Sequence, residues 1–248
     1  MKLIIILLLF LNLNAATINM KYKGELSLFG RVGNASIEYK NDGKNYRITV
    51  VGGGVGILAK LTNNKKFKYE SIGSIKNGIL IPHKYIGTQT TADSTKIKTY
   101  IFDYENSQTV VTREKIEKVT NYKYNIFTFS YDSSSEIVRS AKTKILDELY
   151  KDDMVSVFFN KRHRFLEMKK DETKIIQAVG TKDTQEGIVV KLIKKEDGKY
   201  IYSIRIEKDY LSDGSENATF ILDADNILYE TKLAGIMFFG DARIQRLQ

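Results

Sequence analysis

Apolar and polar residues alternate with a period of two along most of this chain, and this pattern constrains its fold more than any other feature. The residues that share one side of an alternation are Met20, Tyr22, Leu26 and Leu28; Tyr46, Ile48 and Val50; Tyr200, Tyr202, Ile204 and Ile206; and Ile227, Tyr229, Thr231 and Leu233. Successive side chains of a β-strand point to opposite faces. The alternation is therefore typical of antiparallel strands with one buried and one solvated face.

Turn sequences separate these alternating runs. They are K-N-D-G-K at 40–44, K-N-G at 76–78, K-E-D-G-K at 195–199 and D-A-D-N at 223–226. Asn-Gly and Asp-Gly tolerate the positive φ angles of tight hairpins. With a turn about every ten residues, the chain is predicted to be mainly β, with antiparallel sheets that form a sandwich, a β-roll or a barrel-like body.

One stretch departs from the period of two. Apolar residues recur there at steps of three and four, at Val138, Ala141, Ile145 and Leu149. The serines at 133–135 precede this run as capping residues, and Glu136 follows them in the first turn. We predict a helical segment near 136–159 that joins two β-rich halves, 17–131 and 164–248.

The N-terminus is typical of a secretory signal peptide. Lys2 precedes an unbroken apolar run over 3–11, and the small residues Ala15 and Ala16 follow. Nine apolar residues rise only about 14 Å as a helix, too little for a bilayer core of about 30 Å. We therefore expect a signal peptide at 1–16, a single β-rich domain at 17–248, a periplasmic location, and no integral membrane segment in the mature chain.

Composition excludes some classes of function. The chain has no Cys and only two His, so thiol catalysis and Cys-based metal sites are excluded, and we expect no metal and no cofactor. Its formal net charge of +9 comes from 39 Lys and Arg against 30 Asp and Glu, and the lysines are scattered through alternating strands. That scatter favours a solvated surface over a polyanion site. No nucleic-acid-binding motif is present, so no nucleic-acid partner is expected.

The run V-V-G-G-G-V-G-I-L-A at 50–59 matches a dinucleotide-binding pattern at Gly54, Gly56 and Ala59. That fold requires a long helix directly after the glycines, and then a parallel strand. Here the pattern after the glycines lasts about one helical turn and then returns to a strand. The glycines are therefore predicted to form a sharp bend between strands.

Two short polar motifs are the site candidates. The densest basic run, N-K-R-H-R-F at 160–165, makes Arg162, His163 and Arg164 candidates for an anion site. The alternative is a solvated, positively charged helix end. The pair at 152–153, Asp-Asp, is more typical of a helix break or cap than of an acid–base dyad. A Ser-His-Asp set is left open because its members meet only in space, although no G-x-S-x-G motif supports one.

Short motifs in a fixed order also carry a family resemblance. They are Tyr22, Gly24 and Gly30, then G-N-A-S-I-E-Y at 33–39, Y-R-I-T-V at 46–50, G-V-G-I-L-A-K-L at 54–61, the Gly-x-Leu-x-Pro-x-x-Tyr core at Gly78, Leu80, Pro82 and Tyr85, F-D-Y at 102–104, and I-L-D-E-L-Y at 145–150. The chain resembles the exported bacterial family called domain of unknown function 3108. The resemblance implies a periplasmic, mostly antiparallel β protein and no particular activity. Residues 113–135 form a longer and more polar stretch than that pattern has.

Three functions remain as hypotheses. The first is a non-enzymatic protein that binds an apolar or amphipathic envelope component, such as a lipid, or a partner protein, within or along its sheets. The second is an envelope hydrolase or polysaccharide-modifying enzyme that uses carboxylates, which requires a cleft with two convergent acids. The third is a structural or assembly factor, which requires an exposed apolar patch or a long unpaired edge strand.

Overall fold

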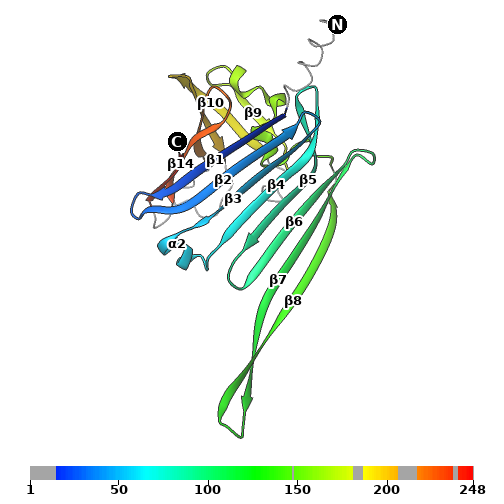
Figure 1. Cartoon of the computed structure of the whole chain (residues 1–248), viewed down its shortest axis with the longest axis vertical. Coiled ribbons are helices and arrows are strands. Elements are labelled where there is room, and N and C mark those ends of the chain that lie inside the picture. Colours follow the sequence, from blue (N-terminus) through cyan, green and yellow to red (C-terminus); the bar gives the residue numbers. More distant parts are fainter. Residues whose placement is uncertain (1–14, 147, 181–186, 206–216, 237–239, 248) are drawn as a thin grey trace, which may run out of the picture.

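The protein is described here by a computed structural model that covers residues 15–146, 148–180, 187–205, 217–236 and 240–247. Fourteen strands form one sheet in which every neighbouring pair is antiparallel (Figure 1). The predicted mainly β, antiparallel fold is therefore confirmed. The strand order is β8-β7-β6-β5-β4-β3-β2-β1-β14-β13-β12-β11-β10-β9, so the sheet is open, with β8 and β9 at its edges.

The strands cover most of the predicted alternating runs. The strands are β1 (Ala15–Leu26), β2 (Gly30–Asp42), β3 (Asn45–Gly54), β4 (Lys66–Lys76), β5 (Ile79–Thr90), β6 (Ser94–Asp103), β7 (Gln108–Asn125), β8 (Ser130–Leu146), β9 (Thr173–Ile176), β10 (Ile188–Glu196), β11 (Lys199–Arg205), β12 (Asn217–Leu222), β13 (Leu228–Ile236) and β14 (Gly240–Arg246). The helical elements are α2 (Gly56–Leu61) and the 3-10 turns η1 (Ser156–Phe158), η2 (Lys161–His163) and η3 (Phe165–Glu167).

The hairpin turns lie where the sequence predicts them. Between β4 and β5, Asn77 and Gly78 have φ angles of 53° and 75°, and between β10 and β11, Asp197 and Gly198 have 49° and 68°. Two successive positive φ angles twist the chain in the sense that antiparallel strands need. The alternation is also confirmed for Tyr22, which is buried, whereas Leu28 is exposed because β1 ends at Leu26.

The predicted helix near 136–159 is wrong, since its first half is a strand and its described second half holds only one short 3-10 turn. Residues 136–146 belong to β8, which pairs with β7 along its whole length, and the first helical turn is η1. Almost every residue of β8 is exposed, so no buried face forces its apolar residues into a period of two. The steps of three and four are coincidental, and the β-branched Ile137, Val138 and Ile145 suit the strand.

The glycine-rich bend is confirmed. The strand β3 ends at Gly54, the six residues of α2 follow, and β4 returns antiparallel to β3. A dinucleotide-binding turn would instead lead to a parallel strand. With α2 as the one α-helix among the described residues, none has the length or apolar character to cross a membrane.

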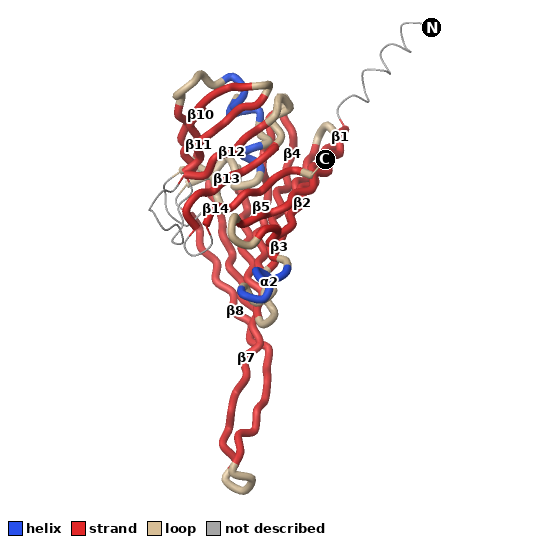
Figure 2. The backbone as a smooth tube through the Cα atoms, turned by 90° about the vertical axis from the view of Figure 1, so that its left-hand side faces the viewer, coloured by secondary structure: helices blue, strands red, loops and turns tan. Residues whose placement is uncertain are grey.

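The core lies on one face of the folded-over sheet, which we call the inner face. Residues 148–172, here called the connecting segment, run from β8 to β9 and contribute to both clusters of buried side chains. Its Val155 packs with Tyr46, Ile48 and the other core residues of β3–β7, whereas its Val157 and Phe165 pack with the core of β9–β12. Figure 2 shows the helical turns of this segment between β10–β12 and β4–β5. The connecting segment thus fills the space between the two halves of the sheet.

Candidate functional site

The predicted basic residues lie in and after η2, and two of them contact a carboxylate of the chain itself. Arg162 Nη1 lies 3.4 Å and His163 Nε2 lies 3.2 Å from Asp152 Oδ2, although the histidine is not aligned for a hydrogen bond. Asn160 Nδ2 donates to the other oxygen of Asp152 at 2.9 Å. Arg164 lies apart, with its side chain exposed and 3.6 Å from Glu167. In the structure, the anionic group beside Arg162 and His163 is the carboxylate of Asp152. Binding of an external anion at these residues stays a prediction.

Asp153 is completely buried, and it holds the connecting segment to the sheet. Its Oδ2 accepts hydrogen bonds from the hydroxyls of Ser71, at 2.6 Å, and Ser156, at 2.9 Å. Its Oδ1 accepts from the backbone N–H groups of Val155 and Ser156, as in the Asx turn that caps a helical start. Burial raises the pKa of Asp153 from 3.8 to about 6, and the hydrogen bonds from Ser71 and Ser156 oppose that rise.

This acidic pair does not form a catalytic cleft. Asp152 and Asp153 have exposed fractions of 2% and 0%, and their oxygens are occupied by side chains and backbone of the protein itself. A general acid or base must reach a substrate proton within hydrogen-bond distance. Both carboxylates therefore act as structural anchors for the connecting segment, in agreement with the cap interpretation of the sequence.

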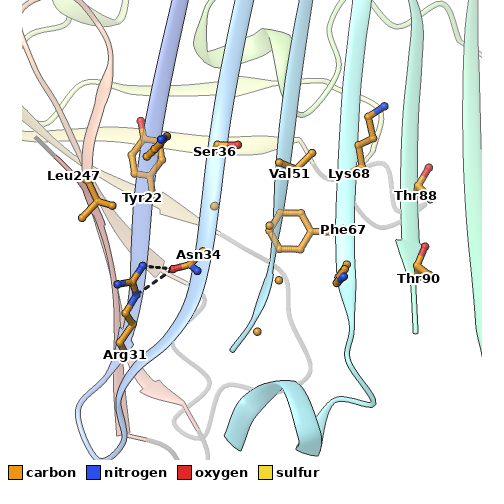
Figure 3. Close-up of a pocket in the computed structure, with 16 residues that line it drawn as sticks. Tyr22, Arg31, Asn34, Ser36, Val51, Phe67, Lys68, Thr88, Thr90 and Leu247 are labelled. Atoms are coloured by element: carbon orange, nitrogen blue, oxygen red, sulfur yellow. Dashed lines mark hydrogen bonds between the residues drawn. The ribbon is translucent and has the colours of Figure 1, made fainter. Parts of the chain in front are cut away.

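A groove of about 670 Å³ crosses β1–β5 on the opposite face of the sheet, which we call the outer face (Figure 3). The strand register places nine of its sixteen lining residues in two rows of directly paired residues. One row is Lys21, Ser36, Val51, Lys68 and Thr88, and the next row on the same face is Lys23, Asn34, Gly53, Lys66 and Thr90. Of these residues only Lys23 lies outside the lining. The row between them, Tyr22, Ala35, Gly52 and Phe67, also contributes to the lining, although the side chain of Tyr22 is buried.

The walls of the groove are basic. Lys21, Arg31, Lys66 and Lys68 line it, and none of its sixteen lining residues is an Asp or Glu. Within the described part of the chain, the amino groups of Lys21 and Lys66 make no ion pair, whereas Lys68 pairs with Glu70 at 2.8 Å. Arg31 donates to Asn34 Oδ1 through Nη2 at 2.6 Å and through Nε at 3.1 Å. The groove therefore favours an anionic group.

The floor of the groove is formed largely by strand backbone, glycines and short side chains, and more of its surface is apolar than polar. A Cβ atom on Gly53 would lie 3.2 Å from both the carbonyl oxygen of Lys65 and Cγ of Lys66, so a side chain here would crowd the wall. Val51 leaves 37% of its surface exposed on the same floor. Backbone and short side chains between long lysines make a channel that suits an apolar chain with an anionic end.

Sequence reasoning misses these groove residues. In the sequence, the lysines at 21, 66 and 68 have the pattern of solvated residues on alternating strands, and each of them does lie on the solvated face of its own strand. The one local signal is the run of glycines at 52–54, which leaves a gap in the outer row. The lining becomes a site only through the register of five strands, and that register is not visible in any single motif.

The architecture defines an open, antiparallel all-β protein whose interior is filled by its own connecting segment and whose groove lies on the outer face. The protein belongs to the family described as Protein of unknown function (DUF3108), which matches residues 17–245. No curated protein and no solved structure matched the chain.

Proposed function

We propose that this protein is an exported, periplasmic and non-enzymatic binding protein that holds an anionic amphipathic component of the cell envelope in the outer groove. The observation that carries the proposal is the combination of four basic side chains, no acidic one and an apolar, glycine-rich floor in one groove. A lipid with a phosphate or carboxylate head group and an acyl chain has the matching chemistry. The apolar run at 3–11 supports export.

The packing of the interior supports a binding site on the outer face. The inner face is occupied by buried side chains of the connecting segment, such as Val157 and Phe165. A ligand there would have to displace this segment and expose Asp153, which a ligand in the outer groove does not require. The proposal therefore places the ligand along the sheet and not within it.

Binding of a defined amphiphile tests the proposal. Isothermal titration with monomeric dodecyl phosphate is expected to show binding, and uncharged dodecyl maltoside is expected to bind more weakly. The double variant Lys21→Gln with Lys66→Gln should bind dodecyl phosphate about tenfold more weakly, because hydrogen bonds to charged groups contribute about 1.5–3 kcal/mol. Lys76→Gln is the matched control, since Lys76 is an exposed lysine of the same strand outside the groove.

A second variant tests the shape of the groove independently of its charge. Ser36→Phe places a ring on the floor in an outward-facing strand position that tolerates aromatic residues. It should abolish binding without changing the thermal midpoint of unfolding. If dodecyl phosphate binds the wild type and both groove variants equally, or does not bind at all, the groove is not the ligand site and the proposal fails.

One observation favours the assembly factor as a second candidate. The edge strand β8 is 17 residues long, and almost all of them are exposed. Such an edge can accept a strand from another chain. Because the protein has no cysteine, Ser140→Cys would carry a single photo-cross-linker on β8, and Thr95→Cys on β6 would be the control. A discrete adduct from the β8 position alone would support this candidate.

A further inference from the structure

A long hairpin projects from the body of the protein. It is formed by β7 and β8, which pair without interruption from Thr109 opposite Leu146 to Asn125 opposite Ser130. The neighbouring strand β6 pairs with β7 only as far as Glu117. Beyond that point the hairpin consists of its own two strands, and it extends well away from the rest of the molecule (Figures 1 and 2).

The end of this hairpin, residues 122–131, carries a concentration of exposed apolar side chains, and we call it the aromatic tip. Its large apolar residues are Tyr122, Tyr124, Ile126, Phe127, Phe129 and Tyr131. Phe127 and Phe129 in the turn have exposed fractions of 88% and 81%. Exposed apolar residues are common singly, but a contiguous group of this kind indicates a surface that binds something apolar.

The apolar character ends sharply on both strands. On β7, Thr120 and Asn121 precede the aromatic tip, and on β8, Asp132 and the serines at 133–135 follow it. Within residues 119–131 the one charged residue is Lys123. The distance from Tyr122 to the turn is about three residues of strand, or about 10 Å. The tip is thus an apolar cap about 10 Å deep above a polar collar.

We propose that the aromatic tip inserts into the interfacial region of a lipid bilayer. Tyr and Phe favour the boundary between head groups and acyl chains, and interfacial elements are buried there by about 5–10 Å. Tyr124 and Tyr131 pack edge to face, with ring centroids 5.2 Å apart, so the tip keeps its shape before it binds. The paired register of the hairpin satisfies the backbone groups that face the partner strand, and insertion limited to the interfacial region leaves the outward-facing groups within reach of water and head groups.

The shape of the tip favours a bilayer over a groove on another protein. A protein groove usually receives one apolar face of a strand or helix, extended over several turns or pairs. Here Ile126, Phe127 and Phe129 lie at the end of the hairpin. The tyrosines lie next to them along the strands, and the hydroxyl and amide side chains of the collar follow. A cap of this form suits end-on insertion into a fluid surface. The inference is independent of the outer groove, which lies on β1–β5.

A tryptophan reporter tests the proposal directly, because the chain contains no Trp. The full-length variant Phe127→Trp is mixed with vesicles of phosphatidylethanolamine and phosphatidylglycerol. Insertion should shift the emission of the introduced indole to shorter wavelength and make it quenchable by brominated acyl chains. Ile175→Trp is the matched control, since Ile175 is 68% exposed on β9. Its emission should not change, even if the apolar run at 3–11 attaches the chain to the vesicles.

Co-sedimentation with the same vesicles measures how much the aromatic side chains contribute to the binding free energy. Phe127→Ser combined with Phe129→Ser should weaken vesicle binding about tenfold or more, from the transfer free energy of two aromatic rings. Ile137→Ser, above the collar on the same hairpin, should bind as the wild type does. The proposal is overturned if the indole of Phe127→Trp stays in water, if the double serine variant binds normally, or if binding disappears at about 0.5 M salt, where charge attraction is screened. Capture of a protein by the tip without vesicle binding would also overturn it.

Discussion

Replacing Asp153 by asparagine is expected to change how the stability of the protein depends on pH. Within the described ranges the buried carboxylate pairs with no cation, and its hydrogen bonds come from two hydroxyls and two backbone N–H groups. Asparagine keeps an acceptor for the backbone N–H groups of Val155 and Ser156. The hydroxyls of Ser71 and Ser156 can reverse and accept from its amide, since a hydroxyl can donate or accept.

The magnitude follows from the pKa of Asp153. Burial raises this pKa from 3.8 to about 6 in the folded protein, so the folded state holds a proton that the unfolded state has lost. The stabilisation is fully present below pH 3.8 and is lost as the pH rises to about 6. Because each pKa unit corresponds to about 1.4 kcal/mol, the wild type should lose about 3 kcal/mol across this window, and Asp153→Asn should not.

Urea unfolding followed by tyrosine fluorescence measures the free energy of unfolding of both proteins from about pH 4 to about pH 7.5. The difference between wild type and Asp153→Asn cancels the other titrating groups. If this difference is constant over the window, the pKa of Asp153 is not raised and the reasoning is refuted. Ser71→Ala is a second check. It removes a hydrogen bond that favours the charged form, so it should move the wild-type transition to higher pH.

Three further outcomes are expected. Phe165→Ala should lower the free energy of unfolding by about 3–5 kcal/mol, because it empties a buried site in the connecting segment, whereas Ile175→Ala at an exposed site should change it by less than about 0.5 kcal/mol in the same urea titration. Gly78→Val should cost about 1–2 kcal/mol by thermal unfolding, because the φ of +75° at this position strains a side chain with a branched Cβ. Protein isolated from the host should have the intact mass of residues 17–248, and a mass that includes residues 1–16 would contradict export with cleavage.

The strands are predictable because their signals are local. Burial of one face imposes a period of two on residues such as Tyr46 and Ile48, and a tight turn imposes Asn-Gly or Asp-Gly chemistry, as at Asn77 and Gly78. Both effects act within a few residues of the chain, so the sequence displays them directly. The open order of the sheet, in which β1 pairs with β14, depends on distant segments and has no local signal.

The prediction of a helix near 136–159 fails where those local signals weaken. In β8 neither face is buried, so the positions of Val138 and Ile145 are not tied to the fold. Pairing with β7 then decides the conformation, and it overrides a weak helical pattern. The same absence of burial leaves residues 113–135 without an interpretation from sequence, although the aromatic residues near the turn are among the most exposed of those described.

The site residues also divide into those with local partners, which the sequence predicts, and those with distant partners, which it does not. The cap interpretation of the Asp-Asp pair is correct for Asp153, because its Asx turn forms within three residues. Its partner Ser71 cannot be found from sequence, since it lies 82 residues away in β4. The basic run at 160–165 stands out as a dense cluster, yet Arg162 and His163 turn to Asp152. The groove lysines are scattered in the sequence and gather only in the sheet.

The connecting segment fills the interior between the two halves of the sheet. Asp152 and Asp153 fix the connecting segment against β4 and β5, through Ser71, Asn160 and the backbone oxygen of Leu80. The segment in turn joins the core of β3–β7 to that of β9–β12. Because an inner ligand would break these buried contacts, the proposed binding uses the outer surfaces. The groove on β1–β5 and the aromatic tip of β7–β8 both belong to the same half of the sheet. If the tip inserts into a bilayer, the half of the sheet that carries the basic groove is the half attached to the membrane. An anionic lipid would then enter the groove from that membrane.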